Sequence, residues 1–225
     1  MATIARDLRG PVYRAELRGS WATAVLFRVP SLPLVWLCTR LGIGPMAVTF
    51  AALVVALSLP VQAATMPLGW AVWTVAISGA FFHVLDCTDG TLARVTGRSS
   101  RRGGDLDFLI DMAQWGMLYL AIGMLADRTL DTGAFWTAVA AFAAWLRLYA
   151  RTVRDRLADP TAQAPESSAL TLKNFVPRFV SGLSGLLPFL ALSGGNLWLA
   201  VLFLVVYAAL DVGEALLPLL HAAPE

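Results

Sequence analysis

The chain has 225 residues and a formal net charge of only +2, and 58% of its residues are hydrophobic while 14% are charged. Soluble domains carry about 25% charged residues, so this composition and the mean hydropathy of +0.68 exclude that class. They predict an all-α integral membrane protein. The two cysteines are too few for a disulfide framework, and we expect no nucleic-acid partner.

The N-terminal segment, residues 1–42, is expected to lie on the membrane rather than to cross it. Residues 1–20 contain four arginines and no apolar core, which excludes a cleaved signal peptide. Residues 21–42 are apolar but are interrupted by two arginines and two prolines. We interpret them as an amphipathic interfacial helix, with a first membrane span as the alternative.

The remainder of the chain predicts a single domain, residues 43–217, of six transmembrane helices. Apolar runs of sufficient length occur at residues 45–64, 68–95, 105–125, 133–149, 174–192 and 197–217. Residues 152–173 are polar and predict a loop, with a continuation of the preceding helix at its start as the alternative, and residues 218–225 form a short tail.

Basic residues predict the orientation of these spans. Six spans place both chain termini on the same side of the membrane. Nearly all arginines lie before the first span, between the second and third, or around the connection from the fourth to the fifth, whereas Arg128 alone falls on the other side. The positive-inside rule then predicts a cell-membrane protein with the basic side and both termini in the cytoplasm.

Four aspartates stand out in the stretch D-C-T-D-G-T-L-A-R-V-T-G-R-S-S-R-R-G-G-D-L-D-F-L-I-D. On a helix Asp86 and Asp89 share one face, and Asp107 and Asp111 share a second. The basic, glycine-containing turn between them predicts a helical hairpin that brings the four carboxylates together. Unpaired charges would be costly to bury among apolar helices. Divalent cations bound by carboxylate oxygens would offset that cost, and Mg²⁺ or Mn²⁺ suits such a site.

The spacing resembles the motif D-x2-D-G-x2-A-R-x8-G-x3-D-x3-D of the CDP-alcohol phosphotransferase family, integral membrane enzymes of phospholipid synthesis. Every fixed position of that motif is present, namely Asp86, Asp89, Gly90, Ala93, Arg94, Gly103, Asp107 and Asp111. The resemblance implies metal-dependent transfer of a substituted phosphoryl group from a CDP-alcohol to the hydroxyl of an acceptor alcohol, with release of CMP. CDP-diacylglycerol is the favoured donor, and a homodimer among membrane lipids is implied.

The resemblance also implies roles for individual residues. Asp86, Asp89, Asp107 and Asp111 would hold two Mg²⁺ or Mn²⁺ ions, and Asp111 would also be the general base that takes the acceptor proton. Many members carry P-N-x-x-T before the first span, where this chain has Pro45 and Thr49 but Met46 in place of asparagine. The expected nucleotide-binding residues are Thr49, Asp86, Asp89, Gly90, Ala93, Arg94, Gly103 and Asp107.

Arginines are also expected near the acceptor. In the resembling phosphatidylinositol-phosphate synthases, basic residues in this region bind the acceptor phosphate, so a polyol phosphate such as inositol phosphate or glycerol 3-phosphate is expected here. Positive-inside topology alone is the alternative explanation. The residues concerned are Arg147, Arg151, Arg154 and Arg178.

Other interpretations remain open at this point. The donor could instead be CDP-choline, CDP-ethanolamine or a soluble CDP-polyol. A membrane cation transporter is the alternative from a different class, because intramembrane aspartates also bind ions. His83, one turn before Asp86, is expected to be a packed core histidine, with a supporting contact to the aspartate as the alternative.

Overall fold

The computed structural model describes residue 13, residues 21–157 and residues 182–221. Within these ranges every regular element is a helix, which confirms the all-α prediction for this part of the chain. The order is α3 (Trp21–Leu26), α4 (Arg28–Leu41), α5 (Pro45–Thr65), α6 (Leu68–Val95), α7 (Arg101–Leu130), α8 (Phe135–Leu157), the 3-10 helices η1 (Leu183–Leu192) and η2 (Gly194–Asn196), and α10 (Leu197–His221).

Four of the described helical segments are long and apolar enough to cross a membrane, which supports a membrane protein. They are α5, α6, α7 and the segment Gly194–Leu217, and they agree with four of the predicted spans.

The other two predicted spans are not confirmed. At 133–149 the structure has α8, which extends to Leu157 into the expected loop and carries arginines and an aspartate in its last turns. Charges lower the hydropathy of that helix below that of a span. At 174–192 the described part is mainly η1, a ten-residue 3-10 helix, and residues 174–181 lie outside the described residues.

In its described part, residues 21–42, the N-terminal segment contains two helices where a single one was expected. Helices α3 and α4 meet at Phe27. Proline has no N–H, so Pro30 cannot donate a helical hydrogen bond to the carbonyl of Leu26, and the break falls at this level. Their placement at a membrane interface stays a prediction, and residues 1–12 and 14–20 lie outside the described residues.

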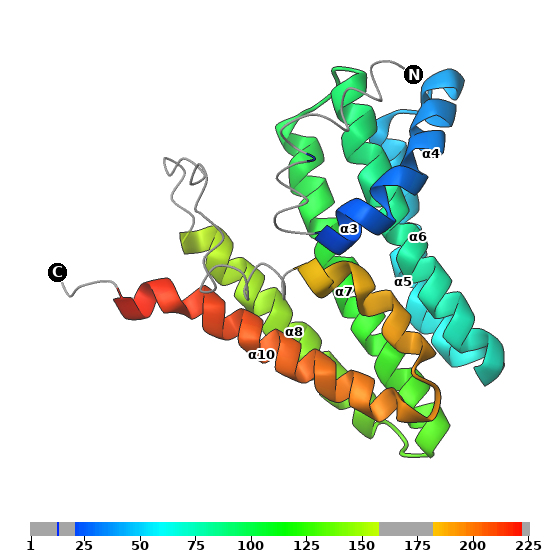
Figure 1. The fold of residues 1–225 in the computed structure, drawn as a ribbon, viewed down its shortest axis with the longest axis vertical. Helices are drawn as coiled ribbons and strands as arrows, with labels where there is room; N and C mark the ends of the chain where they lie inside the picture. Colours follow the sequence, from blue (N-terminus) through cyan, green and yellow to red (C-terminus); the bar gives the residue numbers. More distant parts are fainter. Residues whose placement is uncertain (1–12, 14–20, 158–181, 222–225) are drawn as a thin grey trace.

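Helix α7 is central in the arrangement. Figure 1 shows it between the pair α5–α6 and the pair α8–α10, and it packs against all four of these helices. Small residues let the backbones approach closely. For example, a Cβ on Gly123 would lie 2.8 Å from the Cα atom of Thr137 in α8. The hairpin α6–α7 therefore packs against α5 and, through α7, against α8 and α10.

Two adjacent residues of α7, far from the α6–α7 turn, form hydrogen bonds with the start of α8 and the end of α5. Asp127 is buried and accepts hydrogen bonds from the backbone N–H groups of Trp136 (2.9 Å) and Thr137 (2.8 Å), which caps the first turn of α8. Arg128 donates to the carbonyl oxygens of Ala63 and Met66 at the end of α5. Arg128 therefore has a structural task at this end of the molecule.

Candidate active site

The turn between α6 and α7 follows from its sequence. Gly97 adopts a left-handed conformation (φ 66°) that favours glycine. The N–H of Arg98 donates to the carbonyl of Ala93 (2.8 Å) and the N–H of Gly97 to that of Arg94 (3.3 Å), which is the Schellman pattern of a helix end. The chain then turns directly into the next helix.

Helix α7 begins earlier than predicted. The side chain of Ser100 accepts a hydrogen bond from the N–H of Gly103 (3.1 Å) and so caps the helix. The helix starts at Arg101 rather than at residue 105 because this cap satisfies the exposed backbone donors of the first turn. A Cβ on Gly103 would lie only 3.2 Å from Ser100 Oγ, so the small residue leaves room for the cap.

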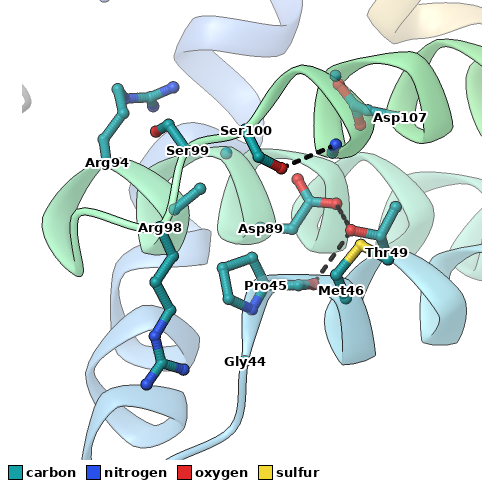
Figure 2. Close-up of a pocket in the computed structure, with 14 residues that line it drawn as sticks. Gly44, Pro45, Met46, Thr49, Asp89, Arg94, Arg98, Ser99, Ser100 and Asp107 are labelled. Carbon is teal, nitrogen blue, oxygen red and sulfur yellow. Dashed lines mark hydrogen bonds between the residues drawn. The ribbon is translucent and has the colours of Figure 1, made fainter.

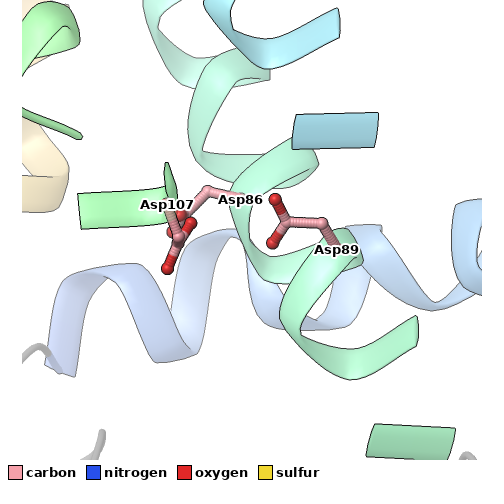
Figure 3. A group of neighbouring side chains, drawn as sticks. All are labelled: Asp86, Asp89 and Asp107. Carbon is pink, nitrogen blue, oxygen red and sulfur yellow. The ribbon is translucent and has the colours of Figure 1, made fainter. Parts of the chain in front are cut away.

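Three carboxylates meet where α6 and α7 face each other. Asp86 and Asp89 come from α6 and Asp107 from α7, and each offers an oxygen such that these atoms all lie within 4.8 Å of one another. Figure 3 shows the three side chains converging. Asp86 and Asp107 also interact directly with each other across the two helices. The structure thus brings together three of the four predicted metal ligands.

Asp111 lies one helical turn beyond Asp107 and is not part of this compact group. Its carboxylate still interacts electrostatically with Asp86 and Asp107. It also interacts electrostatically with the guanidinium groups of Arg147 and Arg151 from α8. Asp111 therefore interacts both with carboxylates of the site and with basic residues of α8.

A pocket with a volume of about 400 Å³ lies beside the carboxylates. Figure 2 shows that its wall is formed by the start of α5, the end of α6, the turn and the start of α7. All of the expected nucleotide-binding residues line it except Asp86. The full lining is Gly44, Pro45, Met46, Thr49, Asp89, Gly90, Ala93, Arg94, Arg98, Ser99, Ser100, Gly103, Gly104 and Asp107.

Sequence reasoning missed the part of this wall made by the turn. Arg98, Ser99 and Ser100 line the pocket although none belongs to the fixed motif. The guanidinium of Arg98 reaches toward the α4–α5 link, where a Cβ on Gly44 would lie 3.7 Å from Nη1 (Figure 2). The only signal in the sequence was the basic character of the turn, which does not reveal where its side chains point.

Two further contacts shape the pocket. The hydroxyl of Thr49 donates to Oδ2 of Asp89 (2.6 Å), which joins α5 to α6. On α6, Nη1 of Arg94 would lie 3.4 Å from a Cβ on Gly90, so Arg94 follows Gly90 on the same helix face as predicted. Gly90 and Ala93 keep this face free of bulky side chains next to the cationic group.

The predicted acceptor residues of α8 differ in their surroundings. Arg147 is buried, with its guanidinium 4.4 Å from the ring centre of Trp115 and 4.6 Å from that of Tyr207. Its Nη1 lies 3.1 Å from Oδ2 of Asp211 on α10. Arg154 pairs with the same carboxylate. Asp211 thus joins two of these arginines to α10, a pairing that the sequence did not predict.

Arg151 is more exposed and more loosely held. It forms an i,i+4 pair with Asp155 (3.9 Å), and its guanidinium lies 5.2 Å from the ring centre of Phe108 on α7. Arg178 lies outside the described residues. The acceptor role of all four arginines stays a prediction.

The cluster of three carboxylates formed by Asp86, Asp89 and Asp107 is suited to binding a divalent cation. Three carboxylates this close repel one another unless they share a proton or a cation, and the donor set consists of oxygen atoms, which Mg²⁺ and Mn²⁺ prefer. The adjacent pocket adds arginines, a helix start and small residues, a combination suited to a phosphorylated ligand.

Comparison with known families agrees with this chemistry. The family model described as CDP-alcohol phosphatidyltransferase matches residues 43–164, which is more than half of the chain. The match includes the carboxylates, the pocket and the arginines of α8. Comparison with individual curated proteins found no significant match.

Proposed function

The chain belongs to the CDP-alcohol phosphatidyltransferase family, and from this premise we propose that it transfers the phosphatidyl group of CDP-diacylglycerol to a polyol phosphate. Members of the family transfer such a group from a CDP-alcohol to an acceptor alcohol. The observation that carries the proposal is the juxtaposition of three converging carboxylates with a pocket lined by Arg94 and Arg98.

The pocket is proposed to bind the cytidine diphosphate part of the donor. Arg94 and Arg98 place positive charge at its wall, and guanidinium groups bind phosphate oxygens through charge-assisted hydrogen bonds. Gly90 and Ala93 let the ligand approach the helix backbone. Met46 offers an apolar surface at the position where many family members have asparagine.

Asp86, Asp89 and Asp107 are proposed to hold the divalent cations on which the family generally depends. Asp111 would complete a site for a second ion. When bound, Mg²⁺ or Mn²⁺ supplies positive charge that neutralises diphosphate oxygens and favours departure of CMP.

Asp111 is also proposed to be the general base. The acceptor hydroxyl oxygen forms a bond to the β-phosphorus of the donor, the bond from that phosphorus to the CMP oxygen breaks, and the hydroxyl proton passes to the Asp111 carboxylate. Support comes from its electrostatic interaction with Asp107 and with Arg147 and Arg151, because an anionic acceptor held by those arginines would approach Asp111.

We assign the main contact with the acceptor phosphate to Arg151. Arg147 and Arg154 already share Asp211, whereas the ion pair given for Arg151 among the described residues is the long, exposed one with Asp155 (3.9 Å). Arg178 is proposed to assist it. The cytoplasmic orientation and a homodimer in the cell membrane complete the proposal.

The test is CMP release by purified protein in detergent with Mg²⁺ or Mn²⁺. CDP-diacylglycerol is offered with inositol phosphate, glycerol 3-phosphate, inositol or serine in separate reactions. We expect release that depends on the metal and on one phosphorylated acceptor. Release only with inositol or serine would refute the anionic acceptor. Release only with CDP-choline, CDP-ethanolamine or a soluble CDP-polyol would refute the lipid donor. If no CDP-alcohol gives release and the protein in vesicles shows metal-dependent ion flux, the alternative interpretation as a membrane cation transporter would be favoured.

A further inference from the structure

Two buried polar side chains lie one helical turn from the carboxylates, on the side away from the α6–α7 turn. His83 precedes Asp86 by three residues on α6, and Gln114 follows Asp111 by three residues on α7. The exposed fraction is 8% for His83 and 1% for Gln114. Residues three apart lie on neighbouring positions of one helix face, so each of the two is next to an aspartate of the site.

Contacts on either side place these two residues at the same level of the hairpin. On one side, Asp86 interacts with both Asp107 and Asp111. On the other side, a Cβ on Gly79 would lie 3.5 Å from Cδ1 of Leu118. His83 lies four residues after Gly79 and Gln114 four residues before Leu118, so they extend from the two helix faces that contact each other. We refer to His83 and Gln114 together as the polar layer.

The polar layer has hydrogen-bonding capacity that the described part of the protein does not use. Within it, neither Nε2 nor Oε1 of Gln114 has a hydrogen-bond partner, and Nε2 of His83 has none. A buried amide without a partner loses its bonds to water and gains nothing in return. Leucine or methionine would fill the same space without that penalty. The amide therefore indicates a partner that the described side chains do not supply.

The surroundings of the polar layer restrict what that partner can be. The ring of His83 stacks on Phe27 with centroids 5.1 Å apart and meets Phe82 edge-on at 5.7 Å. Gly79 and Leu118 close the layer on the side away from the site, together with Pro188 of η1. Towards the site, the next polar groups on the same faces are the carboxylates of Asp86 and Asp111.

We propose that Gln114 and His83 are positioning residues that donate hydrogen bonds, directly or through one buried water, to Asp111 and Asp86. This inference rests on the proposed function, because it gives the polar layer a task in the same site. A carboxylate that directs one oxygen to a cation has a second oxygen free to accept a hydrogen bond. Groups that hold metal-binding side chains in this way change metal affinity about 10- to 100-fold.

Two substitutions remove the donors while keeping the shape. Gln114→Met retains the length of the side chain, and His83→Phe retains the stacking on Phe27. We expect each variant to bind Mn²⁺, followed by electron paramagnetic resonance in titrations of the folded protein, about tenfold more weakly. The melting temperature should stay the same or rise, because an unpaired buried polar group is removed. In CMP release we expect kcat to fall while the KM for the donor changes little.

Matched variants distinguish positioning from packing. Gln62→Met makes the same chemical change on α5, far along the helix from the site. Gln62 donates a hydrogen bond to Ser58 there (2.7 Å). This control variant should leave Mn²⁺ affinity unchanged. His83→Gln keeps a donor and should retain most of the affinity that His83→Phe loses. If an apolar variant does not fold, Gln114→Asn, which shortens the reach of the amide, should still weaken Mn²⁺ binding.

Unchanged Mn²⁺ affinity and kcat in folded Gln114→Met and His83→Phe would overturn the inference, and so would equal losses in His83→Gln and His83→Phe. If Gln114→Met does not fold, a Gln114→Asn variant that binds Mn²⁺ as tightly as the wild type would also overturn the inference. The Mn²⁺ titration needs no substrate. Absence of CMP release by the wild type therefore counts against the proposed function alone, while a selective loss of Mn²⁺ affinity supports the polar layer in either case.

Discussion

The hydroxyl of Thr49 donates a 2.6 Å hydrogen bond to Oδ2 of Asp89, a residue forty positions later in the chain. The same hydroxyl lies 3.0 Å from the carbonyl oxygen of Pro45, so its single proton has two acceptors to choose from (Figure 2). Because both Thr49 and Asp89 line the pocket, this bond couples the orientation of a proposed metal ligand to the first turn of α5.

Thr49→Val removes the hydroxyl and keeps the branched shape. A hydrogen bond to a charged group contributes about 1.5 kcal/mol or more, so we expect Mn²⁺-dependent binding of CDP to weaken about tenfold. Isothermal titration with CDP in the presence of Mn²⁺ measures the change. Thr49→Ser retains the donor and should stay near wild type. A Val variant that binds CDP as tightly as the wild type would show that the bond has no part in the site.

Asp111→Asn separates catalysis from binding. The amide cannot accept a proton from the acceptor, so we expect the rate of CMP release to fall by about 10²-fold or more, while the fold and CDP binding persist. Asp89→Asn provides the contrast, because Asp89 belongs to the compact carboxylate group and should lose Mn²⁺ and CDP binding together. Substantial turnover by Asp111→Asn would remove the assignment of Asp111 as the base.

Gly90→Ala is expected to move stability and binding in opposite directions. Alanine favours the helix over glycine by about 0.5–1 kcal/mol, and the nearest atom to the new methyl group is the flexible end of Arg94 at 3.4 Å. The methyl group also enters the pocket wall, so CDP binding should weaken about tenfold. Gly116→Ala is the matched control, because nothing lies within 4 Å of a Cβ at that position of α7. The melting temperature and the affinity for CDP are measured for both variants. Unchanged CDP binding by Gly90→Ala would mean that the ligand does not approach the face of α6 that carries Gly90.

Asp211→Asn tests the connection between α8 and α10. The carboxylate pairs with buried Arg147 and with Arg154, and removing one partner of a buried ion pair costs about 3 kcal/mol or more. We therefore expect a clear drop in the free energy of unfolding in detergent. Asp155→Asn breaks the exposed pair with Arg151 and should cost less than about 1 kcal/mol. Equal effects of the two substitutions would show that burial of Arg147 does not make its pairing important.

Local spacing was sufficient for the hairpin that carries the site. The expected span 68–95 coincides with α6, and the expected start at Pro45 coincides with the start of α5. The spacing of Asp86, Asp89 and Asp107 also predicted their convergence correctly, because three- and four-residue intervals determine a helix face and a short turn brings two such faces together.

Predictions were weaker where charge interrupts hydrophobicity. The periodicity of α8 did not show whether its arginines mark a membrane boundary or bind within the protein, and Arg147 turned out to be buried between aromatic rings. Gln114 is a lone amide in an apolar run, and in the sequence only its three-residue interval from Asp111 distinguishes it. An amide becomes informative only when its burial and lack of partners are known.

The sequence by itself determined the membrane class, the helical hairpin and the carboxylates, because composition and helical periodicity are local properties of the chain. Only the tertiary structure decided that Thr49 bonds Asp89, that Arg98 lines the pocket and that Asp211 holds Arg147. These relationships join residues on different elements. They depend on which helices pack together and at what level, and a one-dimensional pattern does not contain that information.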